Sequence, residues 1–172
     1  MTDKKKQILA VALELFANDG FNGTSTSKIA KEAGVSEGLI FRHFEHKNGL
    51  LNALVQQAVE RIRLLIEPIL IETDPKKVIQ KSIDLPFALP ESEYPFWKLQ
   101  FKLKWENDYE QDKMRPFIEK LTWAFSNLGY IQARKEAEVL NHIIESISIG
   151  ILREGRKSQE GLKEFILRKY LK

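Results

Sequence analysis

Residues 25–44 read STSKIAKEAGVSEGLIFRHF, and this stretch gives the strongest indication of the fold. Apolar residues at helical spacing predict a short helix over residues 26–33 and a second one over residues 37–44. Gly34 permits a sharp turn between the two, and Ser36 is a residue type that begins helices. The pattern is that of a helix-turn-helix, whose second helix enters the major groove of DNA. Spacing alone leaves a plain helical hairpin equally open.

Helical periodicity continues on both sides of this stretch. Apolar residues between Ile8 and Phe16 predict a first helix, which ends at Gly20 with a positive φ. A long helix is expected over residues 47–71, and the Asp-Pro pair at residues 74–75 begins the next one.

The second half of the chain is predicted to be helical as well. Residues 85–90 read LPFALP, which indicates a loop or a broken helix. Residues 97–105 alternate apolar and polar side chains as a strand does, but a lone strand would have no partner in this chain. Because Trp97, Phe101 and Trp105 also share one helical face, we expect a helix there. Further helices are expected over residues 116–128, 134–153 and 158–170. The sequence therefore predicts an all-α fold of about nine helices without a sheet.

The composition bounds the class of protein. The 172 residues are 43% hydrophobic and 30% charged, which is typical of a folded globular chain. No apolar run reaches the roughly 18 residues that span a bilayer, and the N-terminus lacks the apolar stretch of a signal peptide. We therefore expect a cytoplasmic protein with no membrane partner. The net charge is +3, and residues 1–50 hold seven basic and six acidic residues, so charge alone does not identify a nucleic-acid partner.

The residues that most enzymes and metal sites need are scarce. The chain has no cysteine and three histidines, and it shows no Gly-rich phosphate loop and no convincing nucleophile–base pair. His43 and His46 lie three residues apart, but no third metal ligand is evident. We expect no enzyme, no cofactor and no metal site.

Residues 8–51 resemble the DNA-binding region of the TetR family of repressors, without a gap. The matching residues are Ala12-Leu13-Glu14-Leu15-Phe16, Gly20-Phe21, Thr24-Ser25, Ile29-Ala30, Ala33-Gly34-Val35-Ser36, Gly38, Phe41-Arg42-His43-Phe44, Lys47 and Leu50-Leu51. The rest of the chain resembles the family only in being helical. The resemblance implies a DNA-binding domain over residues 1–46 and a helical ligand-binding and dimerisation domain over residues 47–172.

The resemblance also implies a set of DNA contacts on the two short helices and at the start of the long one. They are Thr26, Ser27, Ser36, Glu37, Gly38, Phe41, Arg42, His43 and Lys47. Phe41 stands where the family usually has a tyrosine that contacts phosphate, and His46 stands where it prefers a better helix cap. A lysine in the first helical turn opposes the helix dipole, so Lys47 is easiest to explain if it binds a phosphate.

Three roles stay open at this point. Glu37 fits either a hydrogen bond from cytosine N4 or a favourable interaction with the dipole of its own helix. Arg42 fits a contact with a base or with phosphate. The lysines at residues 4–6 fit phosphate contacts or a solvated terminus equally well.

The remaining expectations concern the regulatory part. As the resemblance implies, two copies pair through the last two helices and bind a palindromic double-stranded operator. The residues expected in this homodimer interface are Val139, Ile143, Ile147, Ile151, Leu162, Phe165, Ile166 and Tyr170. A small apolar or aromatic effector would bind in a pocket and shift the population of conformations away from DNA. The candidate pocket residues are Phe87, Trp97, Phe101, Trp105, Trp123, His142 and Glu145. The alternative is a DNA-binding repressor that needs no ligand and has a packed regulatory domain.

Overall fold

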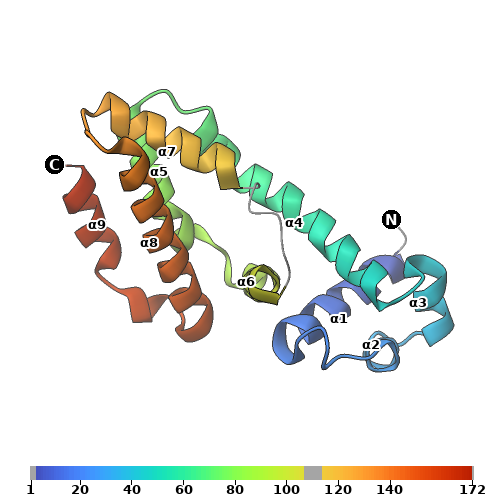
Figure 1. Ribbon diagram of the computed structural model, residues 1–172. Coiled ribbons are helices and arrows are strands. Elements are labelled where there is room, and N and C mark those ends of the chain that lie inside the picture. The colour runs from blue at the N-terminus through green and yellow to red at the C-terminus, as the bar shows by residue number, and fades with distance from the viewer. Residues whose placement is uncertain (1–2, 107–113, 172) are drawn as a thin grey trace. The chain divides into compact units, whose positions relative to one another are not determined.

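The computed structural model describes residues 3–106 and 114–171, except for the side chains of residues 104–106. The helices are α1 (Asp3–Asp19), α2 (Thr26–Glu32), α3 (Glu37–Phe44), α4 (Lys47–Leu70), α5 (Pro75–Ala88), α6 (Tyr94–Glu106), α7 (Arg115–Asn127), α8 (Ala133–Glu154) and α9 (Leu162–Tyr170) (Figure 1). Within these described residues there is no strand, so the predicted all-α fold of nine helices is confirmed. None of the described helices is both long and apolar enough to cross a membrane.

The chain folds as two compact units. Met1–Arg61 and Ser92–Tyr109 form the first unit, and Ile62–Glu91 and Glu110–Lys172 form the second. Helix α4 contributes residues to both. The sequence predicts a boundary after residue 46, between a DNA-binding domain and a ligand-binding and dimerisation domain. That functional division stays a prediction.

The core of the first unit is built from the helix-turn-helix and the helices around it. Ile8, Phe16, Ile29 and Ile40 are completely buried, so α1, α2 and α3 share one core. Leu99 and Leu103 on α6 belong to the same cluster. The predicted helix over residues 97–105 is confirmed, because α6 spans Tyr94–Glu106, and α6 packs against α1.

A lysine of α6 also binds the end of α1. The Lys102 ammonium donates hydrogen bonds to the carbonyl oxygens of Ala17 and Asn18. Carbonyl groups in the last turn of a helix lack partners within it, and the dipole makes that end negative, so a cation is favoured there. Lys102 thus closes the C-terminal end of α1.

The second unit is a helical cluster in which α5 packs against α7, α8 and α9. The expectation of a loop or broken helix over residues 85–90 was wrong in part, because α5 continues through Pro86 and ends at Ala88. A proline removes a single amide donor, and the buried side of α5, including Ile83 and Pro86 itself, holds the last turn in place.

The start of the last helix was also placed wrongly. The sequence predicts a helix from Ser158, but α9 begins at Leu162. Residues Arg156–Gln159 form a 3₁₀ turn, and Gly161 follows with φ 79°, in the left-handed region. A residue with positive φ cannot continue a right-handed helix, so α9 starts after it.

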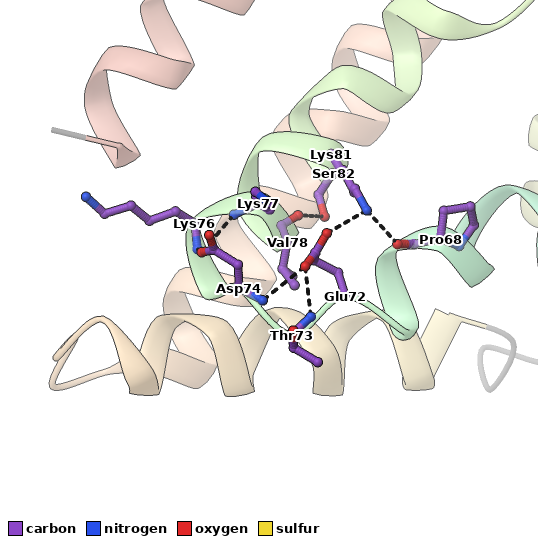
Figure 2. A network of polar contacts seen from close by, with 9 residues as sticks. All are labelled: Pro68, Glu72, Thr73, Asp74, Lys76, Lys77, Val78, Lys81 and Ser82. Atoms are coloured by element: carbon purple, nitrogen blue, oxygen red, sulfur yellow. Dashed lines mark hydrogen bonds and ion pairs between the residues drawn. The ribbon is translucent and has the colours of Figure 1, made fainter.

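A polar network fixes the corner between α4 and α5 (Figure 2). The Glu72 carboxylate accepts hydrogen bonds from the Lys81 ammonium at 2.7 Å and from the backbone N–H groups of Thr73 and Asp74. Asp74 in turn accepts from the backbone N–H of Lys76 and caps α5, which begins at Pro75 as the Asp-Pro pair predicted. The bond from Lys81 and the backbone N–H of Asp74 hold the pKa of Glu72 at about 2, below the ordinary value of 4.5.

This network predicts a specific loss of stability in acid. Because the pKa of Glu72 is lowered by folding, its contribution to stability is complete above pH 4.5 and disappears as the pH falls toward 2. Glu72→Gln cannot titrate, so the variant should lose less stability than the wild type across that window. Urea unfolding at a series of pH values measures the difference. Lys81→Met removes the hydrogen bond that contributes most to the lowered pKa of Glu72, so this variant should also lose less stability than the wild type between pH 4.5 and 2. Identical pH profiles for all three proteins would show that Glu72 contributes nothing to stability in that range.

Candidate nucleic-acid interface

The turn between α2 and α3 is closed by local hydrogen bonds. The Ser25 side chain caps α2 by accepting from the N–H of Lys28 at 3.1 Å. Gly34 has φ 58°, and the N–H groups of Gly34 and Val35 donate to carbonyl groups of the last turn of α2. Ser36 occupies the N-cap position of α3 as predicted, but its hydroxyl makes no capping hydrogen bond.

Helix α3 has one anchored side and one exposed side. Ile40 and Phe44 are buried in the core of the first unit. Gly38 and Arg42 are exposed, and the apolar ring of Phe41 is 45% exposed. Among the described residues, no hydrogen bond or ion pair engages the Arg42 guanidinium. His43 is half-buried, and its ring lies edge-on to that of Phe44 at 6.1 Å between centroids. The predicted contact residues of α3 thus lie mainly on the side that faces away from the core.

Gly38 is a glycine that the fold does not require. A Cβ built at this position meets no heavy atom within 4 Å, and the residue has no positive φ. A glycine inside a helix costs about 0.5–1 kcal/mol relative to alanine, because it loses more backbone freedom on folding. No contact within the described protein therefore accounts for a glycine at this exposed position of α3.

The first turns of α2 and α3 are joined by one hydrogen bond. The Thr26 hydroxyl donates to the Glu37 carboxylate with 2.5 Å between the oxygen atoms, and both side chains are half-buried. Ser27, next along α2, is exposed, and none of the described residues forms a hydrogen bond with its side chain. Sequence reasoning placed these three residues at one interface but did not foresee the bond, since eleven positions separate its partners.

Lys47 holds the loop before α2 against the start of α4. Its ammonium donates to the carbonyl oxygens of Phe21 at 2.9 Å and Thr24 at 3.0 Å, and it lies 4.3 Å from the centroid of the Phe21 ring. The sequence predicts that Lys47 binds a phosphate of DNA. An ammonium has three donors and these two bonds leave one, so the phosphate contact stays a prediction. The same corner has a cap that the sequence did not suggest: the His46 Nδ1 atom accepts from the N–H of Gly49 at 3.0 Å.

Removal of the Lys47 ammonium should destabilise the first unit. Lys47→Met keeps most of the aliphatic stem but leaves two carbonyl groups without their donor, so we expect a loss of about 1–3 kcal/mol in unfolding free energy. Denaturant unfolding measures it, with Lys31→Met on the exposed side of α2 as the control that should stay within about 0.5 kcal/mol of the wild type. A Lys47→Met protein as stable as the control would show that the two bonds contribute nothing.

The connection from α3 to α4 is unusually tight. Glu45 has φ 64° and ψ −47°, and the His46 N–H donates to the carbonyl oxygen of Phe44 at 2.7 Å, which is the geometry of a γ-turn. A Cβ added at Gly49 would lie 1.8 Å from that same Phe44 oxygen. Gly49 is therefore needed for the first turn of α4 to pass beside the end of α3. This corner fixes the direction in which α4 leaves α3.

The candidate pocket residues are divided between the two units. Trp97 and Phe101 lie on α6 in the first unit, where Trp97 is buried and donates a hydrogen bond to Glu93. Phe87, Trp123, His142 and Glu145 lie on helices of the second unit. The side chain of Trp105 lies outside the described residues. Trp123 is 38% exposed, with the Lys120 ammonium 4.2 Å from its ring centroid. The pocket stays a prediction.

The second unit has a groove elsewhere, at the turn between α7 and α8. It is open to solvent, has a volume of about 740 Å³ and is lined by Leu128, Gly129, Tyr130, Ile131, Gln132, Lys135, Glu136, Val139, Lys169 and Tyr170. None of the candidate pocket residues contributes to it.

The candidate dimer residues fall into two groups. Ile147, Ile151, Ile166 and Tyr170 are buried within the second unit, where they already belong to the protomer's own core. Val139, Leu162 and Phe165 are 47%, 38% and 59% exposed, and Ile143 is half-buried. The homodimer interface stays a prediction, and its available apolar area comes from the second group.

Comparison with known proteins agrees with this geometry. Residues 8–54, which contain the helix-turn-helix, match the family described as bacterial regulatory proteins, tetR family. The chain is 44% identical over 57 residues, 33% of its length, to the uncharacterized HTH-type transcriptional regulator YvkB of Bacillus subtilis, and this stretch is 30% of that relative. It is 23% identical over 152 residues to the HTH-type transcriptional activator FasR of Mycolicibacterium smegmatis. The matched stretch is 87% of this chain and 68% of that relative. The chain spans about a third or less of the first relatives that it matches.

Solved structures show the same fold over almost the whole chain. A transcriptional regulator from Saccharomonospora viridis, in complex with choline, superposes with a TM-score of 0.77 at 17% identity, and the match covers 99% of this chain and 96% of that one. The TetR family transcriptional regulator PfmR from Thermus thermophilus gives 0.72 at 18% identity, over 98% and 97% of the two chains. The helix-turn-helix over residues 8–54 is thus similar to that of the tetR family of bacterial regulatory proteins, and the chain shares the helical fold of these solved structures.

Proposed function

We propose that the chain binds double-stranded DNA through the first turn of α2 and the exposed side of α3, and that it regulates transcription by doing so. The observation that carries the proposal is Gly38, a glycine in a helix at a place where no part of the described protein excludes a side chain. A recognition helix lies in the major groove, where a residue without a side chain lets the helix backbone approach the bases.

The chemistry around Gly38 supports this assignment. Arg42 presents a guanidinium that no described residue binds, and Arg is the side chain most often paired with guanine or phosphate in protein–DNA complexes. The exposed ring of Phe41 cannot donate a hydrogen bond to phosphate, but it can contact the methyl group of thymine.

Repression by a homodimer is the form of regulation that we propose. Occupation of a promoter by a bound protein excludes polymerase without any further activity. A dimer with two-fold symmetry recognises a palindromic site, and the exposed apolar side chains Val139, Leu162 and Phe165 supply a surface for pairing through α8 and α9.

Release by a small apolar or aromatic ligand is the finer part of the proposal. A relative of the same fold was solved in complex with choline, which supports a ligand site in this architecture. A ligand shifts the population only if it binds the DNA-free conformation more tightly. The alternative, a repressor without a ligand, predicts that no small molecule changes the DNA affinity.

Salt-dependent binding to a labelled duplex tests the DNA-binding proposal. The logarithm of the wild-type association constant should fall linearly with the logarithm of salt concentration, because bound phosphates release counterions. Arg42→Ala should weaken binding by about tenfold, whereas Lys76→Ala, at an exposed position of α5, should leave it unchanged. Equal losses in the two variants, or no binding by the wild type, would contradict the proposal.

A further inference from the structure

The position of the Glu37 carboxylate is set by α2 rather than by its own helix. Thr26 is its hydrogen-bond partner, at 2.5 Å, and the described residues offer it no other. Glu37 stands at the first position of α3, one residue before the exposed Gly38, and it is only half-buried. One carboxylate oxygen therefore accepts from Thr26, and none of the described residues donates a hydrogen bond to the other.

An ionised carboxylate in the major groove can accept hydrogen bonds but cannot donate one. The base edges that offer a donor there are the N4 amino group of cytosine and the N6 amino group of adenine. Adenine also places its N7 acceptor beside N6, and guanine and thymine present acceptors of their own, so each of these repels a carboxylate. Cytosine is the base that this group fits best.

We propose that Glu37 selects a cytosine at one position of each DNA half-site, and that Thr26 is the positioning residue that holds its carboxylate in the reading orientation. This inference rests on the proposed DNA-binding function. It adds the base that is read and the residue that reads it.

The same bond changes the role expected of Thr26. A threonine hydroxyl has a single hydrogen to donate, and Thr26 gives it to Glu37. Phosphate oxygens accept hydrogen bonds and cannot donate them, so Thr26 has no donor left for the DNA backbone. The exposed hydroxyl of Ser27, one residue later, is the donor of α2 that is free to bind phosphate.

Glu37→Gln is the sharpest test, because it changes one functional atom and keeps the rest. The amide oxygen of the introduced glutamine can still accept a hydrogen bond from Thr26. The second carboxylate oxygen is replaced by an NH₂ group, which donates hydrogen bonds. Selection from a random-sequence duplex library should return a cytosine at one position of each half-site for the wild type. For Glu37→Gln, the same position should lose its cytosine preference by about tenfold in favour of bases that present an acceptor, with the other positions unchanged.

Variants of Thr26 separate a positioning role from a merely structural one. Thr26→Ser keeps the hydroxyl and should keep the cytosine preference, whereas Thr26→Val should weaken the preference at that position and leave the others intact. Thermal unfolding of each variant checks that the protein is folded. If Glu37→Gln weakens binding to all sequences equally, Glu37 only joins α2 to α3 and the inference is overturned. If the wild type binds DNA without any cytosine requirement, the inference fails alone; if it binds no duplex, the proposed function fails with it.

Discussion

Gly49→Ala is expected to lower the free energy of unfolding by about 3 kcal/mol, at the upper end of the usual cost of overpacking. The new Cβ would lie 1.8 Å from the carbonyl oxygen of Phe44, so the backbone must shift. The γ-turn at Glu45 leaves little room for that shift, because its φ of 64° is already unfavourable for a side chain. Denaturant unfolding followed by circular dichroism measures the loss.

A second glycine in the same unit provides the matched control for this substitution. Gly38 and Gly49 are both helical, but a Cβ at Gly38 meets nothing within 4 Å. If Gly49→Ala were as stable as Gly38→Ala, the close approach of α4 to the end of α3 would not exist in solution.

Gly38→Ala is expected to change stability and DNA affinity in opposite directions. Alanine is the better helix former, so the free energy of unfolding should rise by about 0.5–1 kcal/mol. In the proposed complex the added methyl group would stand between the helix backbone and the DNA, so binding should weaken by about tenfold or more, as for the loss of one good contact with a base pair. Unfolding curves and titration of a labelled duplex give the two values on one protein preparation. A variant that gains stability and keeps full DNA affinity would show that nothing approaches α3 at Gly38.

The parts of the fold that follow from neighbouring residues could be predicted. The bounds of α3, the positive φ of Gly20 and the start of α5 after Asp74 are all set within a few positions of sequence. The continuation of α5 through Pro86 could not be predicted from the proline, because packing of the helix decides whether one missing donor matters. The late start of α9 depends on the left-handed conformation of Gly161, which a glycine permits but does not impose.

The candidate nucleic-acid interface also contains features that could not be predicted from the sequence. The resemblance grouped Thr26, Glu37 and Lys47, but it gave each a role toward DNA. The bonds from Thr26 to Glu37, and from Lys47 to Phe21 and Thr24, join segments 11 to 26 residues apart, and helical periodicity carries no information about such pairs. Burial sets a similar limit on α8, where Ile147 and Ile151 share the apolar stripe that was assigned to a partner but lie inside the protomer.

If the exposed side of α3 reads DNA, selection of binding sites from a random duplex library should return a defined sequence. We expect the wild type to enrich an inverted repeat whose half-sites lie about one helical turn, or a multiple of it, apart. Arg42→Ala should lose part of that sequence preference, and Lys76→Ala should return the wild-type sequence. A library that yields no enriched sequence with the wild type, or the same sequence with Arg42→Ala, would show that the exposed side of α3 does not read DNA.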